Sequence, residues 1–304
     1  MHQDAGPTKT ISTKSRAVIA LVIANIALAS GPLFVREADV GPVAAGFWRI
    51  ALAAPVLLVI AMSMGAKPVS SSRGLWGVLA IAGIAFAADL SSWHVGILQT
   101  TLANSTLFGN SATLIFPIYG FFVARMWPTR LQGLALLLAA IGAGLLLGRS
   151  ASLSADNLAG DLLCLLAGIL YTVYFIFMAR ARERLAPIPA LALSSLAAIP
   201  PLLILALAMG ETVMPGNWWP VITLAVVSQL IGQGCMIFAL GHLSPLVIGI
   251  GLLIQPVVAA ALGWGFYNER LATADLVGAV LVAVALVLVR SSEVASTPKE
   301  PKSA

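Results

Sequence analysis

Residues 212–268 read TVMPGNWWPVITLAVVSQLIGQGCMIFALGHLSPLVIGIGLLIQPVVAAALGWGFYN and hold no Asp, Glu, Lys or Arg over 57 positions. One crossing of a bilayer takes about 20 apolar residues, so this stretch is too long for a single transmembrane helix. Its best turn is Gly241-His242-Leu243-Ser244-Pro245, where glycine, a polar pair and proline interrupt the apolar run. The stretch therefore predicts a hairpin of two membrane-spanning helices.

The composition of the whole chain leaves no room for a soluble domain. Of 304 residues, 60% are hydrophobic and 10% are charged, and the mean hydropathy is +0.98. Soluble domains carry about 25% charged residues, so the excess apolar surface must face lipid. The net charge of +5 then records topology rather than nucleic-acid binding. Cys164 and Cys235 lie within apolar runs, where packing is the expected role and no disulfide is indicated.

Charge-free runs along the rest of the chain predict an all-α integral membrane protein with ten transmembrane helices. Leu90–Ala124 is again too long for one span, and we place its turn near Gln99-Thr100-Thr101. The predicted helices cover residues 17–35, 43–64, 75–95, 101–124, 131–148, 158–179, 188–209, 218–240, 245–266 and 273–290.

The distribution of basic residues between the loops supports this count. If the N-terminus is cytoplasmic, the inner segments hold 13 Lys and Arg and the outer segments hold 3, Arg36, Arg149 and Arg270. Cytoplasmic loops carry the excess of positive charge, so both termini are predicted to be cytoplasmic. Lys14, Arg16 and Ala27-Leu28-Ala29 imitate a cleavable signal peptide, but the apolar run continues to Val35, which favours an uncleaved first span.

The two halves of the chain share a pattern. Residues 113–118 read TLIFPI and residues 252–257 read LLIQPV, and an arginine follows each proline after 32 and 34 residues. With five helices in each copy, the second copy enters the membrane from the opposite side, as in many secondary transporters. We therefore expect a first repeat at residues 17–150 and a second at 151–290, inverted around a central cavity, with cytoplasmic tails at 1–16 and 291–304. The alternative is that apolar helices resemble one another by composition alone.

Several motifs carry a family resemblance. Leu243-Ser244-Pro245, Gln255-Pro256, Asn268-Glu269-Arg270-Leu271 and Gly278 resemble the carboxy-terminal half of the ten-helix EamA-type exporters of the drug/metabolite transporter superfamily, and Phe47-Trp48-Arg49-Ile50-Ala51 is similar to their arginine-bearing second helix. The chain departs from the family at residues 127–130, which lack a counterpart of Glu269.

The resemblance implies export of small metabolites. Amino acids, including aromatic ones, and cationic drugs are the implied substrates, and a bacterial inner (cytoplasmic) membrane is the implied location. The implied partners are a small-molecule substrate and the lipid bilayer, without nucleic acid or an obligatory protein partner.

Polar side chains at mid-membrane depth are the candidates for substrate contact, because they usually face a cavity or another helix. Taken singly, each could instead form an interhelical hydrogen bond worth about 0.6 kcal/mol. Trp93 could also be an interfacial anchor. Neutral donors and acceptors with aromatic rings suit a zwitterion, and the predicted substrate-binding residues are Asn25, Trp93, His94, Asn110, Ser111, Tyr171, Tyr174, Gln229, Gln233 and Gln255, with Ser228 at the same depth.

Arg49 and Asp89 are the two full charges well inside predicted helices, at similar depth. An ion pair between them would offset part of the cost of placing charge in the membrane. The sharper alternative is that Asp89 takes up and releases a coupling proton.

Glycine and proline indicate where helices bend. Pro117 and Pro256 lie inside predicted spans, and Gly249 and Gly251 precede Pro256. Proline removes a helical hydrogen bond and permits a kink, so we predict hinges at these four residues. The fifth and tenth helices carry few polar residues and are expected at the periphery.

Other classes of function are less well supported. The chain offers no HExxH, no aspartate-rich diphosphate motif and no cysteine–histidine pair at a plausible spacing, which argues against an enzyme. His94 has no Cys, Asp or Glu at ligand spacing, so we predict no metal and no cofactor. A passive channel for small polar solutes is the remaining alternative, although neither a ring of charges nor a carbonyl-lined filter is visible.

Overall fold

The computed structural model describes residues 12–67, 72–100, 105, 108–148, 155–267 and 273–296, and every regular element in this part of the chain is helical. The elements are α1 (Thr13–Ala29), α2 (Gly31–Glu37), α3 (Pro42–Ser63), α5 (Trp76–Ile97), α7 (Ala112–Ala124), α8 (Arg130–Gly148), η1 (Ala155–Asn157), α9 (Leu158–Arg182), α10 (Pro187–Ala208), α11 (Trp219–Leu224), η2 (Ala225–Gln233), α12 (Gly234–Leu240), α13 (Pro245–Leu252), α14 (Ile254–Tyr267) and α15 (Thr273–Ser296).

The helices lie close to the predicted ranges. The range 101–124 departs most, since α7 begins at Ala112 and residues 101–104 and 106–107 lie outside the described part of the chain. Both tails fall largely outside it as well, as do Arg149 and the segment 268–272 with Glu269. Within the described ranges, six helical stretches are long and apolar enough to cross a membrane, and four shorter apolar helices accompany them.

Three of the predicted spans are not regular α-helices. The first breaks at Ser30, between α1 and α2, where the Ser30 hydroxyl donates to the Ala27 carbonyl at 2.7 Å. The ninth breaks at Leu253, because Pro256 has no N–H to donate to the Leu252 carbonyl. The eighth contains a π-helix, η2, between α11 and α12. Such widened turns occur often at functional sites.

Helices α3 and α10 share a layout of prolines and glycines. Each is 22 residues long, begins with proline (Pro42 and Pro187) and carries another proline thirteen positions later (Pro55 and Pro200). Each is followed by a Met-Gly pair, and Gly65 and Gly210 adopt φ of +76° and +69°, a conformation that only glycine takes without strain.

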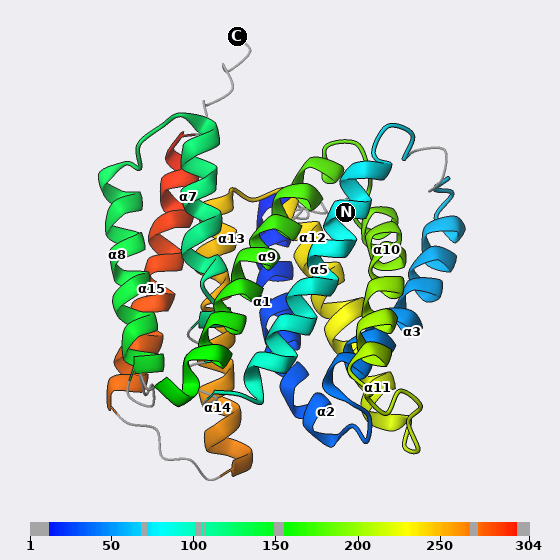
Figure 1. The fold of residues 1–304 in the computed structure, drawn as a ribbon. Coiled ribbons are helices and arrows are strands. Elements are labelled where there is room, and N and C mark those ends of the chain that lie inside the picture. Colours follow the sequence, from blue (N-terminus) through cyan, green and yellow to red (C-terminus); the bar gives the residue numbers. More distant parts are fainter. Residues whose placement is uncertain are drawn as a thin grey trace, which may run out of the picture.

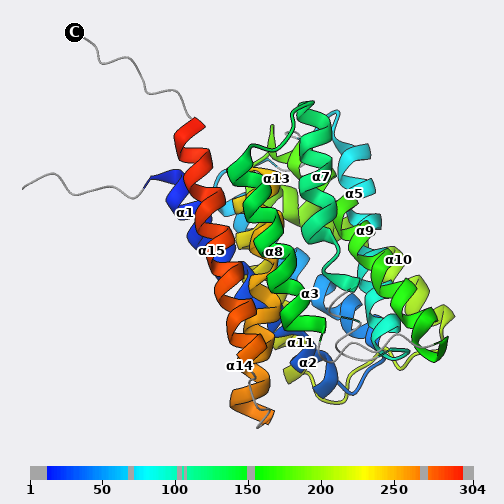
Figure 2. The same ribbon diagram turned by 90° about the vertical axis from the view of Figure 1, so that its left-hand side faces the viewer.

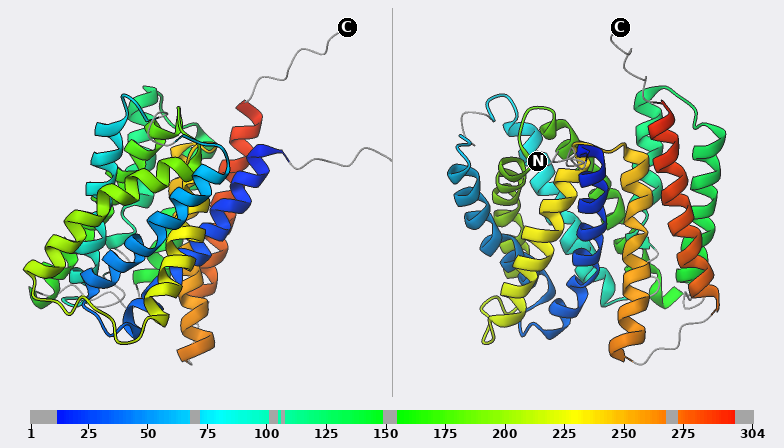
Figure 3. Two further views of the ribbon diagram at one scale, coloured as in Figure 1. Left: turned by 90° about the vertical axis from the view of Figure 1, so that its right-hand side faces the viewer. Right: turned by 180° about the vertical axis from the view of Figure 1, so that it is seen from behind.

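The helices form a bundle in which partners come from the two halves of the chain. α5 packs along α9, α3 along α10, α7 along α13, α8 along α15, and α1 along η2 and α12. Figure 1 shows α8 and α15 at one edge of the bundle and α3 and α10 at the other. Seen from behind in Figure 3, α12 lies beside α1. The fifth and tenth predicted spans, α8 and α15, are thus peripheral.

The two ends of the described chain lie at the same end of the bundle. α1 begins and α15 ends at the upper end in Figure 1, which we call the termini end, whereas α2, α11 and the last turn of α14 lie at the opposite, far end. Figure 2 shows α1, α14 and α15 along one side of the bundle and α5, α9 and α10 along the other.

Large apolar side chains cover the outside of the bundle. Val59 is 61% exposed, Ile118 64% and Leu207 61%, and they lie on three different helices. Because soluble monomers rarely expose extended apolar patches, this surface fits a lipid environment.

At the far end, the loop after α10 is tied to the start of α3. Glu211 accepts hydrogen bonds from the backbone N–H groups of Val43 and Ala44, at 3.2 and 2.8 Å, and so caps the N-terminus of α3. Trp48 Nε1 donates to the Val213 carbonyl at 2.6 Å. These contacts hold α3 and α10 together beyond their side-chain packing.

Candidate functional site

A cavity of about 150 Å³ lies inside the bundle. It extends from the middle of the bundle, at Phe86 and Tyr171, toward the far end, at the last turn of α1 and at Trp93. Both halves of the chain contribute to its wall. The lining residues are Leu28, Ala29, Pro32, Arg49, Phe86, Asp89, Leu90, Trp93, Gly109, Asn110, Ala112, Tyr171, Gln233, Leu252 and Gln255.

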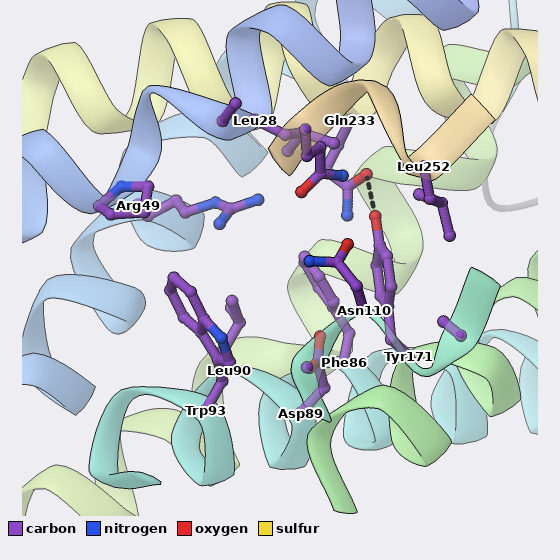
Figure 4. A pocket seen from close by; sticks show the side chains of 15 residues that line it. Leu28, Arg49, Phe86, Asp89, Leu90, Trp93, Asn110, Tyr171, Gln233 and Leu252 are labelled. Atoms are coloured by element: carbon purple, nitrogen blue, oxygen red, sulfur yellow. Dashed lines mark hydrogen bonds between the residues drawn. The ribbon is translucent and has the colours of Figure 1, made fainter. Parts of the chain in front are cut away.

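Arg49 on α3 supplies a cation to this wall. Its side chain is 8% exposed, and its Nε donates to Gln229 Oε1 at 3.1 Å. Gln229 Nε2 in turn donates to the Ser195 hydroxyl at 3.2 Å, so α3, η2 and α10 are linked through one chain of hydrogen bonds. The guanidinium carbon lies 5.6 Å from the centre of the Phe86 ring, within the range of a cation–π contact. Figure 4 shows the guanidinium pointing into the cavity.

Asp89 reaches the same cavity from α5. The two charged side chains therefore line the same cavity, but the direct ion pair predicted between them is not formed. Arg49 is hydrogen-bonded to Gln229, and no nitrogen–oxygen distance within 4.0 Å joins it to Asp89, both of which are described residues. Instead, the Arg49 Nε is satisfied by the Gln229 amide oxygen, and the guanidinium lies beside the ring of Phe86 on the same helix as Asp89.

One face of α5 forms much of the wall. Phe86, Asp89, Leu90 and Trp93 follow the i, i+3, i+4, i+7 spacing that brings side chains to the same side of an α-helix. Asp89 and Trp93 are predicted from the sequence, whereas Phe86 and Leu90 are not. Their spacing from Asp89 is the signal that would have identified them.

Two amide side chains meet the cavity from the second half of the chain. Gln233 on η2 is fully buried, and its Oε1 accepts from the Tyr171 hydroxyl at 3.3 Å. Gln255 Nε2 donates to Asn25 Oδ1 at 2.9 Å, and Asn25 Nδ2 donates to the Leu21 carbonyl at 2.7 Å. Asn25 therefore holds the amide of Gln255 in its orientation from outside the cavity lining.

A cluster of aromatic rings adjoins the cavity through Phe86. Phe86 stacks on Tyr174 with ring centroids 4.5 Å apart, and Phe116 lies 5.4 Å from Phe175. Tyr174 and Phe175 are fully buried and Phe116 is 1% exposed. We call Phe86, Phe116, Tyr174 and Phe175 the aromatic layer.

The predicted substrate-binding residues divide into two groups. Trp93, Asn110, Tyr171, Gln233 and Gln255 line the cavity. The other five, Asn25, His94, Ser111, Tyr174 and Gln229, do not belong to its lining.

Each member of the second group has a visible place in the packing. Asn25 and Gln229 bond to lining residues. His94 is 2% exposed and its Nδ1 lies 2.7 Å from the Pro42 carbonyl oxygen, at the start of α3. Ser111 packs against Gly168, and Tyr174 belongs to the aromatic layer. The contacts of these five side chains in this structure are thus with other helices, and their role in substrate binding stays a prediction.

The sequence missed the apolar part of the wall. Leu28, Pro32 and Leu252 line the cavity but look like any lipid-facing or core residue in an apolar run. No residue pattern separates these three environments in a membrane protein.

The predicted hinge residues meet across the two halves. A Cβ on Gly249 would overlap Pro117 and lie 2.7 Å from the Thr113 carbonyl oxygen, so α13 and α7 touch through backbone at this point. A Cβ on Gly120 would lie 2.8 Å from Pro245 Cβ, and a Cβ on Gly251 would contact Leu21. Small residues of this kind allow helices in membranes to approach closely.

Comparison with known proteins agrees with the fold and with the sequence resemblance. Residues 158–291 match the model of the EamA-like transporter family, which confirms the predicted recognition. A solved crystal structure, titled only as that of a protein, superposes with a TM-score of 0.76 over 93% of this chain and 99% of its own. At 13% identity, that likeness concerns the fold alone. The comparison with curated proteins found no match. Within the described residues, the six long apolar helices and this match over part of the chain agree with a multi-pass, all-α membrane protein.

Proposed function

We propose that this protein, which matches the EamA-like family over residues 158–291, is a small-solute transporter that exports metabolites from the cytoplasm of a bacterium. Amino acids, aromatic or otherwise neutral, are its proposed substrates, with cationic drugs as further candidates. The observation that carries the proposal is a cavity that receives a cation, Arg49, and an anion, Asp89, on different helices, together with neutral amides and aromatic rings.

A zwitterion fits this arrangement of charges. Burying a charge in the membrane is costly unless a partner is present, and Arg49 and Asp89 do not pair with each other. A bound amino acid would bring a carboxylate to one and an ammonium group to the other. Trp93, Phe86 and Tyr171 would contact an apolar or aromatic side chain.

We propose alternating access between two inverted five-helix repeats as the mechanism. The pairs of helices that pack together support this mechanism. If the predicted spans are numbered in order, the second packs on the seventh, the fourth on the ninth and the fifth on the tenth. The first packs on the eighth, and the third packs on the sixth in the same way. Exchanging the halves leaves this list unchanged. The shared layout of Pro42, Pro55 and Gly65 with Pro187, Pro200 and Gly210 supports the same relation.

The proposed orientation places both termini in the cytoplasm of a bacterial cell, as the basic residues predict. The cavity then extends from the middle of the bundle toward the outer side, and the aromatic layer is proposed to close the route to the cytoplasm. This state corresponds to the stage of an export cycle at which substrate is released outward.

Reconstitution into liposomes tests the proposal. Labelled phenylalanine, leucine and a cationic dye are offered to vesicles that hold the purified protein, with empty vesicles as the control. We expect saturable flux of an amino acid that accelerates when unlabelled substrate is present on the other side. Flux that rises linearly with concentration would indicate a passive channel instead, and absence of flux for all three classes would overturn the assignment of substrates.

A further inference from the structure

We propose that Gln233, oriented by Tyr171, donates a hydrogen bond to the carboxylate of the substrate and, with Arg49, selects solutes that carry an acid group. This inference rests on the proposed function and assigns the part of the substrate that this wall of the cavity recognises.

Gln233 presents an unused donor. The side chain is fully buried, and its Oε1 is occupied by the Tyr171 hydroxyl at 3.3 Å. Its Nε2 has no hydrogen-bond partner among the described residues. Figure 4 shows this nitrogen on the side of the cavity toward Asn110. Buried polar atoms in proteins nearly always have a partner, so an acceptor is expected from the contents of the cavity.

Tyr171 decides which end of the amide faces the cavity. Its ring lies 4.2 Å from that of Phe175 and 5.9 Å from that of Tyr174, centroid to centroid, so the hydroxyl is held in place by packing. A hydroxyl that donates to Oε1 leaves the two N–H groups of Gln233 for the ligand. Tyr171 is therefore a positioning residue for Gln233.

Arg49 and Gln233 together favour an anion. Arg49 uses its Nε on Gln229, and its remaining N–H groups point into the same cavity. Both side chains are donors, and a carboxylate can accept from both, whereas an ammonium group can accept from neither. Asp89, on α5, is the group that suits an ammonium. The acid group and the amino group of a substrate are thus bound by residues on different sides of the cavity.

Three related probes separate these walls: phenylalanine, 3-phenylpropionate, which lacks the amine, and 2-phenylethylamine, which lacks the acid. Their affinities are measured by displacement of labelled phenylalanine from the purified full-length protein. A hydrogen bond to a charged group contributes substantially to binding. The substitution Gln233→Leu should therefore lower the affinity for phenylalanine and for 3-phenylpropionate about 10- to 100-fold. The affinity for 2-phenylethylamine should stay within about twofold, since that probe has no acceptor for Gln233.

Gln233→Glu gives a second outcome that loss of folding cannot imitate. A carboxylate at this position repels the acid and attracts the amine, so the variant should bind 2-phenylethylamine more tightly and 3-phenylpropionate more weakly than the native protein does. Equal weakening of all three probes, or no change in any, would overturn the role of Gln233.

Tyr171→Phe tests the positioning role. Without the hydroxyl, the Gln233 amide can turn its oxygen into the cavity, so the preference for 3-phenylpropionate over 2-phenylethylamine should fall about three- to tenfold. The matched control is Tyr119→Phe on α7, which also removes a tyrosine hydroxyl, because Tyr119 does not belong to the lining of the cavity. That control should leave the ratio unchanged.

The outcomes also distinguish this inference from the proposed function. If the native protein binds none of the three probes and transports no amino acid, the proposed substrates are wrong. If it transports phenylalanine but Gln233→Leu and Tyr171→Phe keep the native ratio of acid to amine affinity, amino-acid transport stands and the assignment of Gln233 and Tyr171 fails.

Discussion

At the scale of single residues, Arg49 keeps its charge inside the bundle with an amide against it rather than a carboxylate. Gln229 accepts from its Nε, Ser195 fixes Gln229, and the ring of Phe86 lies beside the guanidinium. Asp89 is left to face the cavity. An arginine is effectively always protonated, whereas a carboxylate in a cavity can exchange its proton, so the two charges are suited to different tasks.

We predict that Asp89→Asn uncouples transport from a pH gradient. Asparagine cannot take up or release a proton, so flux of substrate in liposomes should lose its acceleration by an imposed gradient, while exchange of labelled for unlabelled substrate without a gradient continues. The comparison of flux with and without the gradient, in native and variant vesicles, measures this. An unchanged response to the gradient would remove Asp89 from coupling.

The polar residues of the site were predictable from the sequence to the extent that they break an apolar pattern. Arg49, Asp89, Asn110 and Gln233 stand out in this way, and all four line the cavity. The rotation of each helix about its axis was not predictable, and His94 shows why. It neighbours the lining residue Trp93 in sequence but points to the Pro42 carbonyl.

At the scale of elements, the contact between α7 and α13 is the closest approach of the two halves near the proposed hinges. Gly249 lies against Pro117 and the Thr113 carbonyl, and Gly120 lies against Pro245. Each helix thus presents a proline to a glycine of the other. We propose that the two helices separate here when the termini end opens.

We predict that Gly249→Ala forces α13 away from α7. The new methyl group would overlap Pro117, which is held inside a helix and cannot turn aside, so the closed state should lose about 1–3 kcal/mol. A lower thermal midpoint in detergent and altered flux in liposomes should follow. Gly144→Ala on α8 is the matched control, since a Cβ there has no neighbour within 4 Å. Equal midpoints for the two variants would contradict the role given to this contact.

Helix positions were predictable because the length of an apolar run and the loops between runs are set by the thickness of the bilayer. The breaks and the π-helix inside the spans were less predictable from the sequence. Pro256 indicates a break in its helix, and the break lies at Leu253 as its missing N–H requires. The π-helix at Ala225–Gln233 has no such marker, because the wider turn depends on packing against α1 and α3.

At the scale of the whole molecule, helices of one half pack against helices of the other, and the cavity lies between the two sets. α1, α3, α5 and α7 supply one part of its wall, and α9, η2, α13 and α14 supply the other. A site shared in this way changes shape when the halves move relative to each other. The sequence predicted a shared site from two similar proline motifs, but its extent along the membrane normal needed the packed structure.

We predict that reporters fused to the chain will show the termini end in the cytoplasm. Alkaline phosphatase, which folds only outside the cytoplasm, should be inactive when joined after Ser296 and active when inserted in the loop after Glu211. A fluorescent protein that matures only in the cytoplasm should give the opposite result. Reversed activities would invert the proposed orientation and would turn the described state into one open to the cytoplasm.

The aromatic layer also bears on leakage through the bundle. Phe86, Phe116, Tyr174 and Phe175 are each at most 2% exposed and pack ring against ring. In a protein that spans a membrane, a continuous file of water would let protons and ions escape. Packed rings would interrupt such a file and keep the bundle tight to protons between transport cycles.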